Sequence, residues 1–560
     1  MPPPPNGPLQ LGPLLRHVGE TTATIWVQTT RFARVTVRAA GHEWLTPTFT
    51  VEGLHYALVV CEGLEPGSKQ AYTVDIDDEQ VWPPADSPYP PSVIATIAAG
   101  DTSRIAFGSC RTSSPHDAEG NKVHGVDALR AYAIGMARDD STGWPDIFCF
   151  LGDQVYADEE ISEEMLDFIK SRRDIGEDPT EEIRDYIEYD FLYQLAWSDP
   201  ATRWLLSTVP STMIFDDHDV RDDWNTSWSW KQEIQRTSWW QRRITSALAS
   251  YWVYQHAGNL SPAQLEDDEV WRRIRDHAAA GAEDELDLTE TLDAFATRAD
   301  AHPESYRWSY VRELGDARVV IIDSRAARKL DPDHRSMLDP TEMAWLDEQL
   351  RGDTRHLFIG TSLPFLLPPG LHDFEAMDEQ IAQNAYGRTA GKAGEKLRRL
   401  VDLEHWAAFN EGFEQVFEMV MAVARGERGR TPDIITFLSG DVHNSYLAEV
   451  LDVQRYGARS RIVQAVCSPL RNPMPRAIRV FMSLFARGLA KPMRFVAGRS
   501  SKVPDPKYPW KVTRGPWFDN NLAVVEVEGG SLRFRWWTGE VEGGDVEHPR
   551  VRVVAEVVVG

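Results

Sequence analysis

The sequence predicts an α/β protein that carries a β-sandwich at its N-terminus. Three observations predict this fold class: short alternating runs fill residues 9–98, continuous apolar runs rich in β-branched residues follow from residue 104, and long helical patterns separate those later runs. Alternation is typical of strands with one exposed face, whereas continuous apolar runs are typical of strands buried on both faces by helices. At 560 residues, the chain is expected to form more than one packed unit.

The first unit, over residues 1–98, is expected to be a small β-sandwich of the fibronectin or immunoglobulin kind. Runs such as ATIWVQT, ARVTVRA and YALVV alternate and are broken by Gly/Pro turns such as GLEPGS. The alternative is a sheet that extends the following domain. A separate module is favoured, because the Pro-rich stretch WPPADSPYPPS is typical of a linker.

Six apolar runs predict the main strands of the second unit, over residues 99–560. They are RIAFGSC, DIFCFLGD, STMIFDD, ARVVIIDSR, HLFIGTS and DIITFLSGD, and the tail adds NLAVVEV and SLRFRWWTG. Helical insertions at about 160–310 and 373–430 are too long for plain crossovers, so they are expected to cover one end of the sheet.

One helix has clear signals at both ends. Asp339 and Pro340 supply an N-cap and a first-turn proline, Glu342 supplies the acid of a capping box, and the run closes at Gly352. This helix is expected to be structural.

Composition and charge exclude several classes of function. The formal charge of −27 argues against a nucleic-acid partner, because the long-range field repels polyanions. The cysteines are widely separated, so neither a disulfide framework nor a zinc knuckle is indicated. They are Cys61, Cys110, Cys149 and Cys467. No signal peptide or membrane-spanning run is recognisable, so a cytoplasmic location is expected, or export if a signal has been removed.

Residues at the ends of four predicted strands are metal-ligand types. Ligand sites in α/β sheets gather beyond the carboxyl ends of the strands. Each residue alone has a structural explanation, as a loop start, a helix cap or a small hydrophobe. Their joint occurrence after strands predicts one metal centre. The candidate ligands are Cys110, Asp153, Tyr156, Asp217, Asp441 and His443.

Five motifs occur in order between residues 104 and 450. They are GSC (108–110), GDQVY (152–156), DDHD (216–219), DSR (323–325) and SGDVH (439–443). On these motifs the chain resembles the PhoD-like, or alkaline phosphatase D, branch of the calcineurin-like metallophosphoesterases, and the N-terminal sandwich resembles that family's leading domain. The resemblance implies a metallophosphoesterase sandwich, with two central mixed sheets flanked by helices, that hydrolyses phosphate esters with a metal-bound hydroxide.

The resemblance also implies roles for the candidate ligands. Asp153 is expected to bridge two metal ions, with Cys110 and Tyr156 on a ferric iron. Asp217 takes the place of an asparagine in the broader superfamily, and Asp441 with His443 completes the site. Iron and calcium are the leading expectation, while Mn²⁺ and Zn²⁺ remain alternatives on ligand types alone. The segment VRDDWN departs from relatives that often carry asparagines, which adds further candidate ligands for the second metal. These are Asp222, Asp223 and Asn225.

His218, beside Asp217, is expected to act with Asp153 as a catalytic residue. His218 is placed to protonate the departing alkoxide, with Asp219 or another acid orienting it. Arg111 and Arg325 are candidates for contacting the non-bridging phosphate oxygens, because a guanidinium matches phosphate bidentately. The alternative for both arginines is a structural salt bridge.

Two weaker features concern substrate and partners. Five tryptophans follow the DDHD motif, and we interpret most as core residues, with Trp224 and Trp228 as candidate substrate-pocket residues. Residues 471–502 carry eight Lys/Arg and no Asp/Glu. Packing on the chain's own domain is favoured there over peripheral membrane contact.

The expected partner is a phosphate-ester substrate, and the oligomeric state stays open. The alternatives to a phosphatase are a phosphodiesterase or phospholipase D-like activity on nucleotides or lipids, and a non-catalytic metal-binding scaffold.

Overall fold

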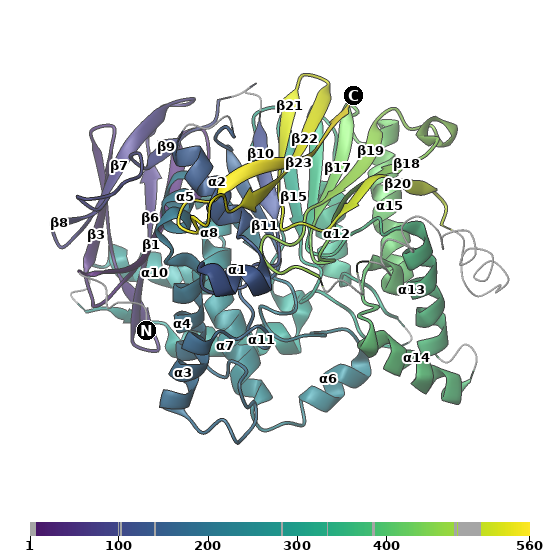
Figure 1. Cartoon of the computed structure of the whole chain (residues 1–560), viewed down its shortest axis with the longest axis horizontal. Coiled ribbons are helices and arrows are strands. Elements are labelled where there is room, and N and C mark those ends of the chain that lie inside the picture. The colour runs from purple at the N-terminus through teal and green to yellow at the C-terminus, as the bar shows by residue number, and fades with distance from the viewer. Residues whose placement is uncertain are drawn as a thin grey trace.

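The computed structural model describes residues 7–98, 100, 103–138, 142–281, 284–332, 334–383, 387–474, 479 and 506–560. The N-terminal strands form one end of the molecule, two larger sheets form its centre, and helices cover the lower side in the view of Figure 1.

The N-terminal strands form a two-sheet sandwich. One sheet has the order β1 (Leu9–Val18), β2 (Thr22–Thr29), β6 (Leu54–Glu62), β5 (Phe49–Val51) and β13 (Leu286–Asp287). The other contains β4 (His42–Pro47), β3 (Arg34–Ala39), β7 (Lys69–Ile76) and β8 (Glu79–Trp82), with β9 (Val93–Ala95) paired to β7. Alternate side chains of β2, including Ile25 and Val27, fill the space between the two sheets.

The sandwich shares a core with the helices of the second unit. Trp26 and Tyr56, on the outer face of the β1–β2–β6 sheet, pack on Tyr254 with ring centroids 5.2 and 5.5 Å apart. The short strand β13, which lies far along the chain, pairs with β5 in parallel. Because both faces of this sheet are buried, the N-terminal strands are fixed against the rest of the molecule.

Two mixed sheets form the centre. The first has the order β12 (Ser211–Ile214), β11 (Ile147–Leu151), β10 (Arg104–Gly108), β21 (Leu522–Glu528), β22 (Ser531–Glu540) and β23 (Arg550–Val559). The second has the order β14 (Tyr310–Leu314), β15 (Ala317–Ile322), β16 (His356–Thr361), β17 (Ile434–Ser439), β19 (Arg461–Val466), β18 (Ser445–Val450) and β20 (Trp510–Trp517). The six predicted strands are confirmed as β10, β11, β12, β15, β16 and β17, and the two in the tail as β21 and β22.

The continuous apolar runs are explained by burial on both faces. In β15, Val319 and Ile321 belong to the core that the two central sheets share, whereas Val320 and Ile322 belong to a second core on the opposite face. Strands β10, β11 and β12 run parallel, as do β15, β16, β17 and β19. The parallel strands of each sheet therefore bring their carboxyl ends to the same edge.

Helices fill the connections. Between β10 and β12 lie α1 (Ala118–His124), α2 (Ala128–Ala137), α3 (Glu163–Arg172), α4 (Tyr186–Trp197) and α5 (Pro200–Thr208). After β12 come α6 (Trp228–Ile234), α7 (Trp240–Tyr251), η1 (Trp252–His256), α8 (Ala257–Asn259), α9 (Pro262–Leu265), α10 (Glu269–Ala279), α11 (Thr289–Ala301) and η2 (Pro303–Ser305). The later helices are α12 (Pro340–Gln349), α13 (Pro369–Ala382), α14 (Arg388–Leu400), η3 (Trp406–Phe409), α15 (Asn410–Arg425) and η4 (Val453–Tyr456).

Helix α12 confirms the predicted start but not the predicted capping box. The Asp339 carboxylate accepts hydrogen bonds from the backbone N–H groups of Thr341 and Glu342, and Pro340 occupies the first turn. The Glu342 side chain is buried and turned toward Ser309 instead of the cap. The helix ends at Gln349, before Gly352: the backbone of Leu350 leaves the helical conformation, at ψ 86°, while its N–H still donates to the Leu346 carbonyl.

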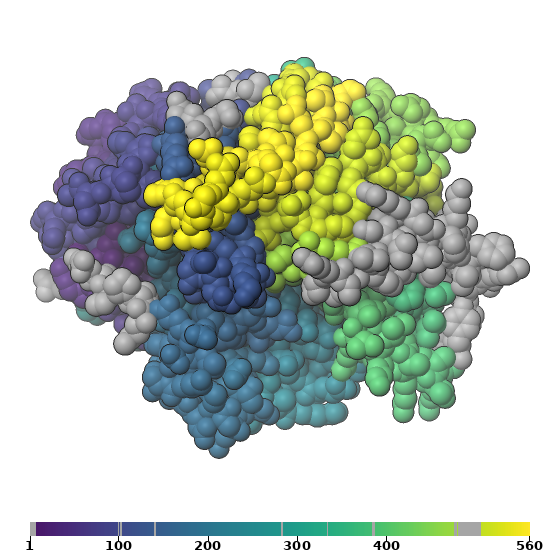
Figure 2. All heavy atoms as spheres, in the orientation of Figure 1, coloured from purple at the N-terminus to yellow at the C-terminus, as the bar shows by residue number. Residues whose placement is uncertain are grey.

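The C-terminal strands complete the first central sheet and pack on an early helix. Helix α2 packs on β22 and β23, and the Arg130 guanidinium donates to the carbonyl oxygens of Val546 and Glu547 at 3.1 and 3.2 Å. Figure 2 shows the yellow C-terminal residues lying against the blue residues of the early helices on this face.

Most of the basic segment at 471–502 lies outside the described residues. Arg471 is described and is buried, and its guanidinium donates to the Pro115 carbonyl at 2.6 Å and to the Gly125 carbonyl at 3.3 Å. Within the described parts of the chain, no helix has the length and apolar character needed to cross a membrane.

Candidate metal centre

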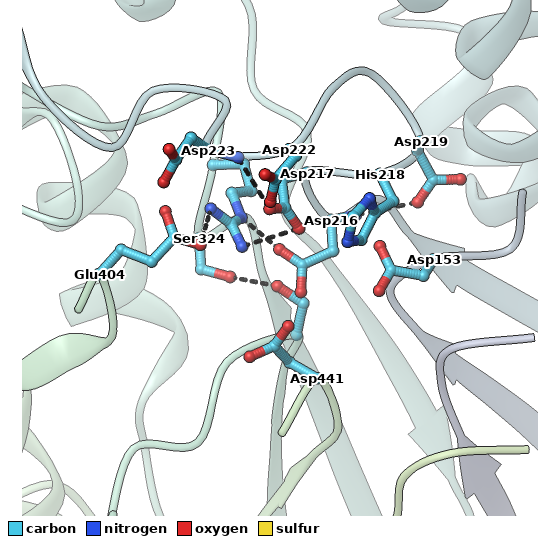
Figure 3. A network of polar contacts seen from close by, with 12 residues as sticks. Asp153, Asp216, Asp217, His218, Asp219, Asp222, Asp223, Ser324, Glu404 and Asp441 are labelled. Atoms are coloured by element: carbon cyan, nitrogen blue, oxygen red, sulfur yellow. Dashed lines mark hydrogen bonds and ion pairs between the residues drawn. The ribbon is translucent and has the colours of Figure 1, made fainter. Parts of the chain in front are cut away.

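Four carboxylates converge at the ends of the central strands. One oxygen from each of Asp153, Asp216, Asp217 and Asp441 lies within 4.8 Å of the others. Asp153 follows β11, Asp216 and Asp217 follow β12, and Asp441 follows β17. Figure 3 shows these side chains pointing toward one another. A second, adjoining group has ligand atoms that also lie within 4.8 Å of one another, and it consists of Asp217, His218 and Asp222. The cluster is thus assembled from both central sheets.

Glycines let the loops that carry these residues approach closely. A Cβ atom on Gly152 would lie 2.7 Å from the Asp216 Cβ, and one on Gly440 would lie 2.0 Å from the Ser109 Oγ. The neighbouring residues Cys110, Asp153 and Asp441 have φ values of 55°, 47° and 63°. Such left-handed backbone costs on the order of 1 kcal/mol or more for each non-glycine residue and collects at functional sites. The strained backbone is therefore located at the residues whose side chains form the site.

Burial and crowding destabilise the charged forms of three carboxyl groups of the cluster, those of Asp153, Asp216 and Asp217. Burial raises the pKa of Asp153 well above its usual value, and the nearby Asp216 and Asp217 raise it further, although His218 opposes them. Burial likewise raises the pKa of Asp222 to about 8, with Asp217 contributing. The Asp153 Oδ1 and Asp216 Oδ2 atoms are buried without a hydrogen-bond partner among the described residues. Buried, unpaired carboxylate oxygens are the donor set that a cation satisfies, so these residues fit a bound metal ion.

Cys110 and Tyr156, the thiol and phenol among the candidate ligands, lie beside the carboxylate cluster. The Cys110 Sγ lies 3.3 Å from the Asp153 Oδ2 and 3.2 Å from the Ser468 Oγ. Burial and the charges of Asp153 and Asp441 raise the pKa of the Cys110 thiol. The Tyr156 ring stacks on His218 with centroids 4.8 Å apart. Burial, together with the nearby Cys110, raises the pKa of the Tyr156 hydroxyl.

His443 is the sixth predicted ligand and lies beside Asp441, outside both tight groups. Burial lowers the pKa of His443 to about 4, which keeps the imidazole neutral and able to bind a metal. Its backbone is in the left-handed region, at φ 46°, and its N–H donates to the Ser468 Oγ at 3.2 Å.

An acid other than Asp219 orients His218. The His218 Nδ1 lies 3.0 Å from the Asp158 Oδ1, and Asp158 is itself buried. Burial opposes protonation, but Asp158 and Asp217 outweigh it and raise the pKa of His218 well above its usual value. Asp219 instead accepts from the backbone N–H of Asp216 at 2.9 Å and from the Gln255 amide at 3.2 Å.

The two candidate arginines have different surroundings. The Arg111 guanidinium is buried away from the cluster, where it donates to Asp127 at 2.9 Å and to the Ala196 carbonyl at 2.6 Å. Arg325 lies within the centre and forms ion pairs with Asp216, Asp217 and Glu404. The contacts of both guanidiniums thus correspond to the structural alternative, and contact with a phosphate stays a prediction.

The two candidate tryptophans also differ. Trp224 is 1% exposed and packs edge-on against Phe215, so its position matches the core interpretation. Trp228 is 46% exposed and lines a cleft of about 630 Å³ between α6 and α14, together with Lys392, Lys396 and Glu395.

The remaining candidates from the VRDDWN segment lie beside the cluster. The backbone N–H of Asp223 donates to the Asp217 Oδ2 at 3.2 Å, and burial raises the pKa of its carboxyl to about 9. The Asn225 amide donates to the Arg325 carbonyl at 3.2 Å.

Five residues of the centre were missed by sequence reasoning. They are Asp158, Asp216, Glu375, Glu404 and His405. Asp216 begins the DDHD motif and Asp158 lies two residues after the GDQVY motif, so an acid in or close to a motif was an available signal. The other three lie in the helical insertion, where no strand end marks them.

Comparisons with known proteins support the same assignment. The family model described as PhoD-like phosphatase matches residues 127–481, and a model described as a domain of unknown function, DUF7800, matches residues 6–94. No curated protein sequence matches the chain. Among solved structures, one titled "Structure of PhoD" is similar with a TM-score of 0.58 and 13% identity, over 98% of this chain and 90% of that one. A purple acid phosphatase from yellow lupin seeds has a TM-score of 0.48 and 10% identity over 98% and 73%, which is too weak to support an argument.

A mixed α/β fold matched by a phosphatase family model defines a phosphoesterase hydrolase, and its cluster of carboxylates is a candidate metal site. The chain belongs to the PhoD-like phosphatase family, since that family's model matches more than half of its residues.

Proposed function

We propose that this chain hydrolyses phosphate esters at the carboxylate cluster, with His218 as the general acid. The observation that carries the proposal is the position of His218, which belongs to the same tight group as Asp217 and Asp222 and is oriented by Asp158. When bound, metal ions would lower the pKa of water and neutralise charge on the phosphate oxygens. The residues proposed to hold them are Cys110, Asp153, Tyr156, Asp216, Asp217, Asp441 and His443.

The environment of His218 suits a proton donor. Asp158 fixes the Nδ1 side of the ring, which leaves Nε2 as the atom that holds the proton to be donated. A positioned acid contributes about 10²–10⁴-fold to a rate when the leaving group needs a proton.

Iron and calcium remain the proposed metals, and both monoesters and diesters remain proposed substrates. A division near residue 98 and a cytoplasmic location also remain proposals.

His218→Asn is expected to lower turnover of an alkyl phosphate ester by about 10²–10⁴-fold. The loss should be smaller for an aryl ester, because an aryl oxide leaves without needing a full proton. Elemental analysis should show unchanged metal content. Equal losses for both esters would mean that His218 does not protonate the leaving group, and loss of metal would mean that His218 is a ligand. If the metal-loaded wild type cleaves neither ester, the scaffold alternative is correct.

We also propose that the cleft beside Trp228 receives the part of the substrate beyond the phosphate. Trp228 lies three residues after Asn225, so its Cα is within about 11 Å of a residue at the centre. Lys392 and Lys396 line the same cleft as the exposed indole, which suits an anionic substrate with a flat apolar group.

Trp228→Ala is expected to raise KM about 3–10-fold for esters with a large aromatic group, since one stacking contact is worth about 1 kcal/mol. Methyl phosphate should be cleaved with unchanged kinetics. Phe32→Ala, which truncates a 40% exposed ring on the N-terminal sandwich, is the control. Equal effects on both substrates would place Trp228 outside the substrate path.

A further inference from the structure

Two consecutive residues of the helical insertion reach the metal centre. Glu404 and His405 lie between α14 and η3, in a segment that carries none of the family motifs. Glu404 pairs with Arg325, and His405 contacts Asp441. The insertion therefore contributes charged groups to the centre as well as covering it.

His405 is held between two carboxylates. Its Nε2 lies 3.1 Å from the Asp441 Oδ2, and its Nδ1 lies 2.6 Å from the Glu375 Oε1 on α13. Glu375 is 1% exposed and His405 is 7% exposed. Polar contacts are stronger in such a water-poor surrounding, and rotating the ring would break both at once. The chain Glu375–His405–Asp441 therefore fixes the orientation of the imidazole.

Asp441 needs such a support. It sits on the loop after β17 in a left-handed conformation, at φ 63°, and its carboxylate faces Asp153, Asp216 and Asp217. Three further carboxyl groups crowd the Asp441 side chain on the cluster side, and the contact with His405 holds it. Hydrogen-bonded partners of metal-binding carboxylates orient them in the same way in other metal sites.

We propose that His405, anchored by Glu375, is a positioning residue that holds the Asp441 carboxylate in its metal-binding orientation. This inference rests on the proposed function. It makes α13 and the loop before η3 part of the metal centre, so the affinity for metal depends on the helical insertion as well as on the strand ends.

A different interpretation is that the three residues only neutralise one another in the core. The two interpretations differ in what a substitution changes: metal affinity in the first, stability alone in the second. His256 supplies the comparison, because it is also buried, packs on Trp308 and Tyr306, and contacts no residue of the cluster.

The test is a titration of the metal-stripped full-length protein with Mn²⁺, in which the EPR signal of free Mn²⁺ gives the dissociation constant. His405→Leu is expected to weaken binding about 10–100-fold, as the loss of such hydrogen-bonded partners does elsewhere. His405→Gln, which keeps one donor, should be affected less, and Glu375→Gln should fall between the two. His256→Gln should bind Mn²⁺ as the wild type does.

A folded His405→Leu protein that binds Mn²⁺ with wild-type affinity would overturn the inference. If that variant does not fold, Glu375→Gln carries the test, and wild-type affinity in it has the same meaning. Failure of the wild type itself to bind Mn²⁺ would instead overturn the proposed metal centre, so the two failures are distinguishable.

Discussion

Asp153→Asn is expected to remove the bound metal and lower turnover by more than about 100-fold, which is the upper range for losing a residue that only supports a ligand. Asp153 follows the central strand β11 and its carboxylate lies in the group with Asp216, Asp217 and Asp441. The resemblance noted in the sequence predicts that Asp153 bridges two ions, and this substitution tests that prediction. Elemental analysis of wild type and variant measures the loss. Iron with a visible charge-transfer band in the wild type would support Cys110 and Tyr156 as iron ligands, whereas colourless zinc or manganese would support the broader superfamily.

The control for this substitution is Asp190→Asn. Asp190 is also a buried carboxylate, but it accepts hydrogen bonds from Gln28 and Tyr254 beneath the N-terminal sandwich. The Asp190→Asn protein should contain as much metal as the wild type. The metal-free Asp153→Asn protein should unfold at no lower temperature than the metal-free wild type, because the substitution removes one of four crowded carboxylates. Full metal content in Asp153→Asn would refute the assigned role.

Arg325→Met is expected to destabilise the fold by about 3–5 kcal/mol, the usual cost of leaving buried charges without their partner. The Arg325 side chain is inaccessible to solvent, and it lies 3.0 Å from Asp217 and 2.6 Å from Glu404 in addition to its contact with Asp216. Methionine fills similar space but leaves three carboxylates uncompensated. The shift of the urea or thermal unfolding midpoint measures the effect.

Arg355→Met is the matched control. Arg355 pairs with Asp433 at 3.2 Å, but both side chains are more than 40% exposed, and such a surface pair is worth less than about 1 kcal/mol. A similar small effect in Arg325→Met, combined with a raised KM, would instead favour the phosphate contact that the sequence predicts for Arg325.

The main strands could be predicted from the sequence because their signals are local. A run such as ARVVIIDSR is apolar at every position since β15 lies between two cores, and that requirement is visible without knowing its neighbours. The ligand types after β10, β11, β12 and β17 could also be predicted, because ligand sites in α/β proteins lie beyond the carboxyl ends of strands. That these ends belong to two sheets whose edges meet was decided by the tertiary structure.

The partners of those residues could not be predicted, because they depend on contacts between distant parts of the chain. Asp158 orients His218 from 60 positions away, and Glu404 reaches Asp217 only through Arg325. The same reason explains the arginines: DSR and GSCR both present a guanidinium after a strand, yet Arg325 turns into the cluster while Arg111 turns toward Asp127.

The sequence by itself determined the strands, the order of the motifs and the kinds of ligand, since periodicity and residue chemistry are properties of short segments. Only the tertiary structure decided that α13 and the loop before η3 place Glu375, Glu404 and His405 at the centre. The periodic pattern of a helical insertion does not show which partner a buried polar side chain contacts. That pairing depends on how the insertion packs on the sheet edge.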